Sequence, residues 1–478
     1  MTQTKKPSIS EILDIKSVAV VGVSPSMGYY WAHSMLQWEH DLRVWFVSRS
    51  GGEVLDHKIL TSIEDIPEKI DYAIIRVPYK AVPETLKDCH RKGAKGATIF
   101  TSGFSELGTV EGRQREMEIR KILDETGMRA FGPNCMGLMY PKIGIAFMPT
   151  IKRLSGDVGF LSQSGGVAIT IYTAGVESGV GFSKVFSFGN QVDITHQELL
   201  DYFRDDADTN VVGAYLEGVK NGKKILDSMV KLAEIKPLVV LKGGRSTAGS
   251  RAAASHTGAL AGSKEIWKAA FRQANVLTVD TVEDLIATLS VFSLCPKPET
   301  RDVGLVAISG GASVILTDLC IEKGINVPRT SEETIKKLDP LILDVGTGLG
   351  NPIDLAADYY QDQTTSEVIR IVGEEPNFDS LIIEADVHNM YQAASIMGAA
   401  DILVEFWKAM AQAGKKVVEK ENKPVLVVVP EVAYPGPRVD AWNVFVEHGL
   451  PVFRNINEAV SAFSRVCDYY DIRKNRGS

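Results

Sequence analysis

The residue best suited to chemistry is His256, which lies in the segment Ser-His-Thr-Gly-Ala-Leu-Ala-Gly over residues 255–262. Its neighbours are too small to bury an imidazole, and the glycines leave the backbone free to move. A neutral imidazole is a nitrogen nucleophile near neutral pH, and a phosphorylated histidine is a high-energy carrier. The segment therefore predicts phosphoryl relay through His256. The alternative is a surface histidine in a flexible loop.

Two glycine loops follow short apolar stretches and offer places for phosphate. Ser164, Gly165 and Gly166 precede an apolar helical stretch, and residues 309–311 repeat the pattern. Glycine lets the backbone N–H groups at a helix start face an anion, which the helix dipole also favours. We predict phosphate binding at these loops, with a tight turn that binds nothing as the alternative. Neither loop has the lysine of a P-loop, which argues against a direct NTPase.

A carboxylate that could orient the histidine follows another apolar run. Glu217 comes directly after Val211–Leu216, so we expect it at the carboxyl end of a buried strand, where ligands of α/β sheets bind. There it would hold one ring nitrogen of His256 and leave the other free to attack phosphorus. A helix N-cap or a surface salt bridge is the alternative role.

The elements that must position these residues alternate between short β-branched runs and amphipathic helical stretches. Buried parallel strands are predicted at residues 17–22, 43–48, 72–77 and 97–101, with helical patterns between them. The same alternation continues along the chain. It predicts an α/β fold of doubly wound domains, whose ligands bind beyond the carboxyl ends of the strands.

An internal repeat divides the rest of the chain. Residues 157–166, DVGFLSQSGG, recur without a gap as residues 302–311, DVGLVAISGG. Three further pairs follow in the same order: Asn190–Asp193 with Asn351–Asp354, Glu217 with Glu384, and Lys236 with Lys423. We predict two copies of one α/β module after a distinct first domain. The predicted domains cover residues 1–150, 151–296 and 297–478. The second copy has no Ser-His-Thr-Gly segment, so we expect catalysis in the first.

Composition and charge argue against several classes of protein. The 478 residues include 60 acidic and 52 basic side chains, a net charge of −8, so no basic field attracts a nucleic-acid backbone. The longest apolar runs are strand-sized, which predicts neither a signal peptide nor a membrane span. Five single cysteines without CxxC pairs fit reduced thiols better than disulfides or a metal cage. We expect a soluble cytoplasmic protein that binds no metal, nucleic acid or membrane.

The first domain opens like a dinucleotide-binding fold but lacks its fingerprint. Gly22 and Ser24 follow a strand, but Tyr29-Tyr30-Trp31 is bulky where GxGxxG needs close backbone approach, which disfavours ordinary NAD binding. After the second strand, Arg49 and Ser50 stand where an NAD site carries an acid. Arginine beside hydroxyls suits a phosphorylated ribose, as in NADP or coenzyme A.

These motifs, in this order, resemble the α subunit of NDP-forming acyl-CoA synthetases, which is related to the α chain of succinyl-CoA synthetase. The resemblance spans nearly the whole chain. It rests on these segments: Val77-Pro78, Thr101–Phe104, Gly132–Asn134, Gln163–Gly166, Gly189–Asp193, Tyr215–Glu217, and Lys242–Ser246 leading to Ser255–Gly258.

The resemblance implies a Rossmann-like CoA-binding domain followed by two duplicated flavodoxin-like domains. It also implies that His256 is the phosphorylated histidine, that Glu217 orients it, and that residues 164–166 bind phosphate. The implied CoA-binding residues lie in the first domain: Gly22, Ser24, Arg49, Ser50, Val77, Pro78, Thr101, Ser102 and Asn134. The implied reaction is reversible: acyl-CoA, phosphate and ADP give a carboxylic acid, CoA and ATP through an acyl phosphate and a phosphohistidine.

The resemblance further implies partners. In this family ADP or GDP binds with Mg²⁺ to an ATP-grasp unit, and none is recognisable after residue 470. We therefore expect a separate ATP-grasp β subunit, self-association within an α2β2 assembly, and a small carboxylic acid or its acyl-CoA as substrate. Two other interpretations stay open, a CoA-binding regulatory protein without catalysis and an NADP-dependent oxidoreductase. A regulatory protein would have no need of His256, Glu217 and the Ser-Gly-Gly loop.

Overall fold

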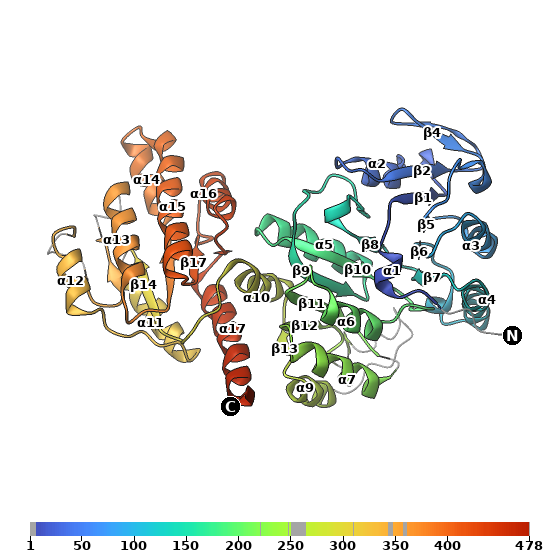
Figure 1. Ribbon diagram of the computed structural model, residues 1–478. Coiled ribbons are helices and arrows are strands. Elements are labelled where there is room, and N and C mark those ends of the chain that lie inside the picture. The colour runs from blue at the N-terminus through green and yellow to red at the C-terminus, as the bar shows by residue number, and fades with distance from the viewer. Residues whose placement is uncertain are drawn as a thin grey trace. The chain divides into compact units, whose positions relative to one another are not determined.

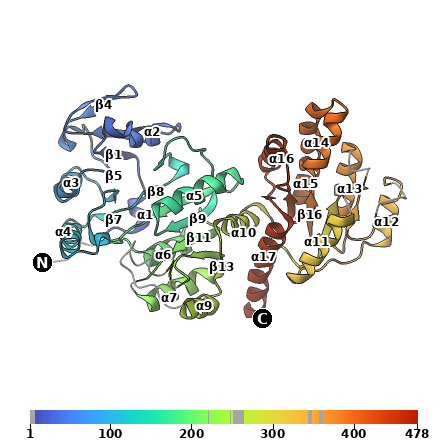
Figure 2. The same cartoon turned by 180° about the vertical axis from the view of Figure 1, so that it is seen from behind.

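The chain forms two compact units in the computed structural model, which describes residues 6–219, 221–246, 248–249, 264–308, 310–342, 348–356 and 361–477. Residues 1–176 and 181–282 belong to the first unit, and residues 177–180 and 283–478 to the second. Figure 1 draws the first unit in blue to yellow-green and the second in yellow to red, and Figure 2 gives the view from behind. Within the described ranges, no helix is both long enough and apolar enough to cross a membrane.

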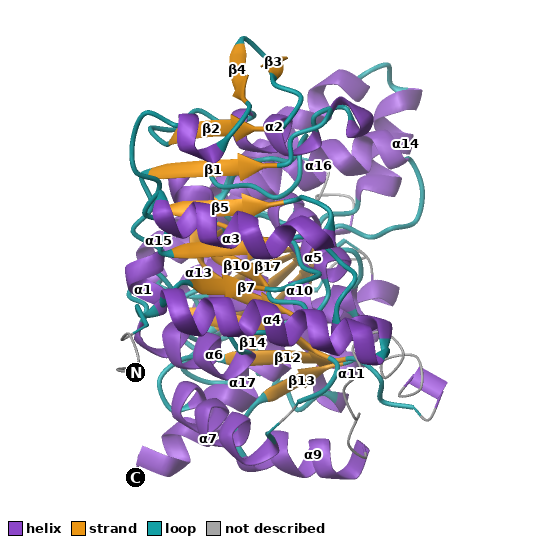
Figure 3. Ribbon diagram, turned by 90° about the vertical axis from the view of Figure 1, so that its right-hand side faces the viewer, coloured by secondary structure: helices purple, strands orange, loops and turns teal. Residues whose placement is uncertain are grey.

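The first unit begins with a seven-stranded sheet in the order β3-β4-β2-β1-β5-β6-β7. Its strands are β1 (Ser17–Val21), β2 (Arg43–Val47), β3 (Gly52–Val54), β4 (His57–Leu60), β5 (Tyr72–Ile75), β6 (Gly96–Ile99) and β7 (Arg129–Phe131). All neighbours are parallel except β3 and β4. Figure 3 shows β2, β1 and β5 as neighbouring orange arrows. The four strands predicted from sequence are therefore confirmed as β1, β2, β5 and β6.

Apolar side chains on both faces of this sheet explain why helices cover both. Ala19 and Val21 of β1 pack in a cluster with α3 (Val82–Arg91) and α4 (Val110–Thr126). On the opposite face, Ile12 of α1 (Ile9–Ile12) lies against Gly96 and Tyr72. Successive residues of a strand point to opposite faces, so a continuous apolar run buries both. The remaining helix of this region is α2 (Tyr30–Leu36).

A second sheet completes the first unit, in the order β13-β12-β11-β9-β10-β8. Its strands are β8 (Gly137–Met139), β9 (Ser155–Ser162), β10 (Phe182–Ser187), β11 (Val211–Leu216), β12 (Leu238–Lys242) and β13 (Leu277–Val279). Its helices are α5 (Gly165–Glu177), α6 (His196–Asp205), α7 (Gly222–Ala233) and α9 (Lys264–Gln273). Strand β8 lies inside the range predicted for the first domain, yet it pairs antiparallel with β10. The chain that leaves the first sheet thus contributes directly to the second.

The second unit is built on a parallel five-stranded sheet in the order β15-β14-β16-β17-β18. Its strands are β14 (Val303–Ala307), β15 (Ile353–Asp354), β16 (Ser380–Glu384), β17 (Val425–Val428) and β18 (Val452–Phe453). Leu381 and Ile383 pack into one core, and Ile382 between them packs into another. The Ile382 core includes α10 (Val282–Leu294), α11 (Gly310–Glu322) and α17 (Ile456–Gly477). The other includes α12 (Glu332–Leu338), α13 (Asp362–Glu374), α14 (Val387–Ile396), α15 (Leu403–Glu421) and α16 (Pro435–Glu447).

Strand order supports the predicted duplication. The series β13-β12-β11-β9-β10 and β18-β17-β16-β14-β15 are the same arrangement, with β8 added in the first unit. Lys236 and Lys423, which the repeat pairs, also behave alike. The Lys236 ammonium donates to the carbonyls of Phe203 and Asp206, and that of Lys423 to those of Gly373 and Glu375. Both α/β modules, and the doubly wound fold, are confirmed.

The strand registers correct the predicted equivalence of Glu217 with Glu384. Val158 pairs with Val211, and its repeat counterpart Val303 pairs with Ser380. Six residues beyond Val211 stands Glu217, and six residues beyond Ser380 stands Asp386. The structural counterpart of Glu217 is therefore Asp386. The sequence comparison matched two Glu residues after apolar runs, but strand pairing fixes which residues share a place.

The strand registers also show that a second predicted pair, Asn190–Asp193 with Asn351–Asp354, does not occupy equivalent positions. Ser187 pairs with Ser162 at the end of β9. Asp354 pairs with Ala307, which is the repeat counterpart of Ser162. Asp354 therefore corresponds to Ser187 and ends a strand, whereas Asp193 lies in the loop beyond it.

Candidate active site

A cavity of about 1080 Å³ lies within the first unit, at the carboxyl ends of its strands. Its lining comes from the turns after β1, β2, β4, β5, β6, β7, β9 and β10, together with residues of α3 and the start of α5. Open α/β sheets bind their ligands in this position, because the loops leave the strand ends there. Both sheets of the first unit thus contribute to one site.

Nearly all of the predicted ligand residues line this cavity. Every residue predicted to bind CoA except Ser50 is on it, and so are all three predicted phosphate residues: Gly22, Ser24, Arg49, Val77, Pro78, Thr101, Ser102, Asn134, Ser164, Gly165 and Gly166. The Ser50 hydroxyl lies 3.1 Å from that of Ser48, which does line the cavity. The structure thus brings together residues that are spread over 145 positions of the sequence.

Hydrogen bonds join three of the lining loops directly. The Thr101 hydroxyl donates to the Val77 carbonyl at 2.7 Å, and the Asn134 N–H donates to the Thr101 carbonyl at 3.0 Å. Gly22 approaches the turn after β5 so closely that a Cβ atom there would lie 2.2 Å from the Arg76 carbonyl oxygen. Its φ of +100° also requires glycine. Hydrogen bonds and close backbone packing therefore join the loops on the side of the cavity that is predicted to bind CoA.

The predicted phosphate loop forms the N-terminal turn of α5. The Ser162 hydroxyl donates to the Ser164 carbonyl at 2.7 Å and accepts from the Ser164 N–H at 3.2 Å, which curls the chain after β9. The Ser164 hydroxyl then accepts from the Val167 N–H at 3.4 Å, as an N-cap does. Because Ser164, Gly165 and Gly166 all line the cavity, the positive end of the helix dipole faces it.

Glu217 emerges at the end of β11 as predicted and is buried, with 5% of its surface exposed. Its own N–H and that of Gly218 both donate to the side-chain oxygen of Gln163. Burial raises the pKa of Tyr215, and the nearby Glu217 carboxylate raises it further. Glu217 is not among the residues that line the cavity. His256 lies outside the described residues, so its pairing with Glu217 stays a prediction.

Lys242 is a buried lysine that sequence analysis treated only as part of a motif. Its ammonium donates to the Glu217 carbonyl at 2.7 Å and also to the Gly243 carbonyl. It lies 5.0 Å from the centre of the Trp267 ring. Burial lowers the pKa of Lys242 to about 8, although the Glu217 charge acts in the opposite direction. Lys242 thus fixes the Glu217 backbone from the β12 side.

Asn190, which lines the cavity, ties together neighbouring loops of its wall. Its side-chain amide donates to Glu106 at 2.6 Å and to Glu116 at 2.9 Å, and its backbone N–H donates to the Pro133 carbonyl at 3.0 Å. Burial alone would raise the pKa of Glu106, but hydrogen bonds from Asn190 and from the backbone N–H groups of Gly103, Phe104 and Glu106 lower it below its usual value. Sequence analysis noted the Asn190 motif but gave this side chain no role.

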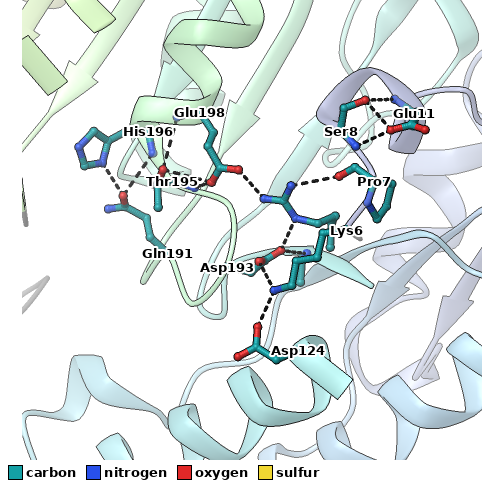
Figure 4. Close-up of polar contacts among 12 residues, drawn as sticks. Lys6, Pro7, Ser8, Glu11, Asp124, Gln191, Asp193, Thr195, His196 and Glu198 are labelled. Carbon is teal, nitrogen blue, oxygen red and sulfur yellow. Dashed lines mark hydrogen bonds and ion pairs between the residues drawn. The ribbon is translucent and has the colours of Figure 1, made fainter. Parts of the chain in front are cut away.

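An ion-pair network centred on the buried Asp193 anchors the loop that carries Asn190 (Figure 4). Arg129 of β7 donates to Asp193 at 2.8 Å and to Glu198 at 2.7 Å. Lys6 bridges Asp193 and Asp124, with N–O distances of 2.9 and 2.7 Å. Arg129 and Asp193 are both nearly inaccessible to solvent. The loop is therefore tied to the last strand of the first sheet.

Comparisons with known proteins fit this geometry. Residues 16–141 match the CoA binding domain, and residues 155–292 match the succinyl-CoA ligase like flavodoxin domain. The α subunit of ADP-forming acetate–CoA ligase II from Pyrococcus furiosus is 34% identical over 377 residues, covering 77% of this chain and 80% of that protein. The chain belongs to the ADP-forming acyl-CoA synthetase family. The predicted family and the predicted enzyme class, an acid–thiol ligase, are both confirmed.

Other members of the ADP-forming acyl-CoA synthetase family resemble the chain along most of its length. The solved structure of the dinucleotide forming acetyl-coenzyme A synthetase 1 of Ca. Korarchaeum cryptofilum, in complex with phosphate and ADP, aligns with a TM-score of 0.81 over 96% of both chains at 28% identity. The ADP-forming acetate–CoA ligase of Methanocaldococcus jannaschii is 36% identical over 346 residues. The alignment spans 72% of this chain but only 48% of that relative.

Proposed function

We propose that this chain is the α subunit of a ligase that reversibly converts a small acyl-CoA, phosphate and ADP into the carboxylic acid, CoA and ATP. One observation carries the proposal: a single cavity is lined by both the residues predicted to bind CoA and the loop predicted to bind phosphate. Both reactants of a phosphorolysis therefore have a place in the same cavity.

In the first step, phosphate at Ser164–Gly166 attacks the carbonyl carbon of the acyl-CoA. The carbon–sulfur bond breaks, an acyl phosphate forms, and the CoA thiolate takes up a proton. The N–H groups at the start of α5 and its dipole stabilise the phosphate and the charge that develops on the carbonyl oxygen. Arg49 and the hydroxyls near it hold the phosphorylated ribose of CoA.

In the second step, one ring nitrogen of His256 attacks the phosphorus of the acyl phosphate, and the carboxylate leaves. Glu217 accepts a hydrogen bond from the other ring nitrogen, so the attacking nitrogen keeps its lone pair. The phosphoryl group then passes from His256 to ADP, which regenerates the free imidazole. Positioning and electrostatic stabilisation are the main demands of such a transfer.

The nucleotide, with Mg²⁺, belongs on a separate ATP-grasp β subunit. The related Pyrococcus furiosus protein is named a subunit α, and about half of the Methanocaldococcus jannaschii relative lies beyond the region that this chain matches. We propose an α2β2 assembly of the two subunits. All five cysteines are free thiols, which is consistent with a protein that functions in the reducing cytoplasm.

The test measures the transfer of radiolabelled phosphate to the protein. The chain is incubated with acetyl-CoA and radiolabelled phosphate in the presence of the host's ATP-grasp protein, before ADP is added. We expect an acid-labile, base-stable label on the wild type, no label on His256→Asn, and a normal label on the control His388→Asn in the second unit. ADP should remove the label as ATP. CoA binding without any label on the wild type would instead favour a regulatory protein.

A further inference from the structure

Gln163 joins the phosphate loop to the Glu217 loop through three hydrogen bonds. Its side-chain oxygen accepts from the N–H groups of Glu217 and Gly218, the latter at 3.0 Å. Its side-chain nitrogen donates to the Gly218 carbonyl at 3.0 Å. Gln163 directly precedes Ser164, so one side chain links the start of α5 to the end of β11.

The chemistry of an amide suits this place. The carbonyl oxygen of glutamine accepts two N–H groups while its NH₂ group donates to a carbonyl. Gln163 is only 5% exposed, so water cannot readily replace bonds that are lost there. Its own N–H continues the strand pairing by donating to the Tyr215 carbonyl at 3.2 Å. The side chain therefore sets the distance between two loops that neighbouring strands bring together.

The second module provides an internal comparison, because it lacks this link. The repeat places Ile308 where the first module has Gln163, and Ile308 packs in an apolar core with Ala385. Asp386, the counterpart of Glu217, accepts from the Asn389 N–H at 3.1 Å and caps its own helix α14. The link is thus present in the module that carries the His256 segment and absent from its duplicate.

We propose that Gln163 is a positioning residue of the phosphoryl relay, which holds the phosphate loop and Glu217 at the separation that His256 needs to reach both. The proposal rests on the proposed function. A shift of about 1 Å between reacting groups costs on the order of a hundredfold in rate. Loss of this link should therefore slow phosphoryl transfer more than it weakens substrate binding.

Two substitutions separate this role from simple stability. Gln163→Met keeps the length of the side chain and removes all three bonds. We expect His256 to be labelled about 10- to 100-fold more slowly from acetyl-CoA and radiolabelled phosphate, with little change in the Michaelis constant for acetyl-CoA. Gln163→Glu introduces a carboxyl group that reproduces all three bonds only when it is protonated. Its rate relative to wild type should therefore rise as the pH is lowered, whereas the relative rate of Gln163→Met should stay constant.

The matched control is Asn351→Leu in the second unit. Asn351 also makes three bonds to backbone groups, with the Leu305 N–H and with the carbonyls of Val303 and Pro328. Its loss should lower the unfolding midpoint without slowing labelling of the folded protein, measured with the ATP-grasp partner present.

Wild-type labelling rates in Gln163→Met, or a relative rate of Gln163→Glu that does not change with pH, would overturn the inference. Should Gln163→Met fail to fold, the pH series on Gln163→Glu decides alone. Absence of label on wild type would overturn the proposed function itself.

Discussion

At the scale of single residues, two buried glutamates at strand ends have different surroundings. The backbone of Glu217 is held by Gln163 and Lys242. Glu384 ends β16 in the second unit, where burial raises its pKa to about 7 and the charge of Asp386 adds to the rise. Glu384 therefore keeps a proton under conditions in which an exposed glutamate would lose it.

This proton makes the stability of the second unit depend on pH. The folded state holds it up to about pH 7, whereas the unfolded chain releases it near its ordinary value of 4.5. The native state binds more protons within this window, so its free energy of unfolding falls as the pH rises from about 4.5 to 7. In Glu384→Gln the free energy of unfolding should no longer fall over this pH range. At pH 7 the variant should be more stable than the wild type by about 1–3 kcal/mol, relative to their difference at pH 4.5. Urea unfolding at both pH values measures this.

The exposed Glu333, whose side chain is 82% accessible, is the matched control. Glu333→Gln should follow the wild-type pH dependence, because this substitution removes a carboxylate from the protein surface and not from the core. Equal pH dependence in wild type and Glu384→Gln would contradict the assignment of the raised pKa.

At the scale of elements, the ion pairs around Arg129 join strand β7 to the loop before α6 (Figure 4). Arg129→Met should lower the free energy of unfolding by about 3–5 kcal/mol, because it leaves the buried carboxylate of Asp193 with one cationic partner fewer. The control is Arg91→Met, which removes an arginine with half its side chain exposed beside Asp88 and Glu84. Exposed pairs contribute about 0–1 kcal/mol. Equal losses in chemical denaturation of the two variants would show that the network has no special role.

The elements also show how far sequence alone leads. Strands such as β1 and β5 are visible because a parallel sheet buries both faces and leaves an unbroken apolar run. The cavity-lining turns can be predicted from the sequence because glycine and hydroxyl residues follow those apolar runs. Gln163 and Lys242 are not predictable as positioning groups, because the backbone atoms that they tie at the end of β11 lie 25 to 55 residues away in the sequence. The mismatch of Glu384 has a similar origin, since register is a property of paired strands.

At the scale of the whole molecule, the chain has two units with separate cores, and the cavity belongs to the first alone. The CoA binding domain, residues 16–141, lies within that unit. Most of the flavodoxin domain, residues 155–292, lies there too. We therefore expect two thermal transitions in calorimetry, one for each unit. A ligand of the cavity should act on only one of them.

Coenzyme A provides this test, because a ligand that binds only the folded state stabilises it by mass action. At a concentration about 100 times its dissociation constant, CoA should stabilise the first unit by about 2.7 kcal/mol and leave the second transition in place. Thr101→Val removes a hydroxyl that both lines the cavity and ties Val77 to its loop. The variant should lose most of the shift at the same CoA concentration. A shift confined to the second transition would place CoA outside the cavity, whereas equal shifts of both would show that the units unfold as one.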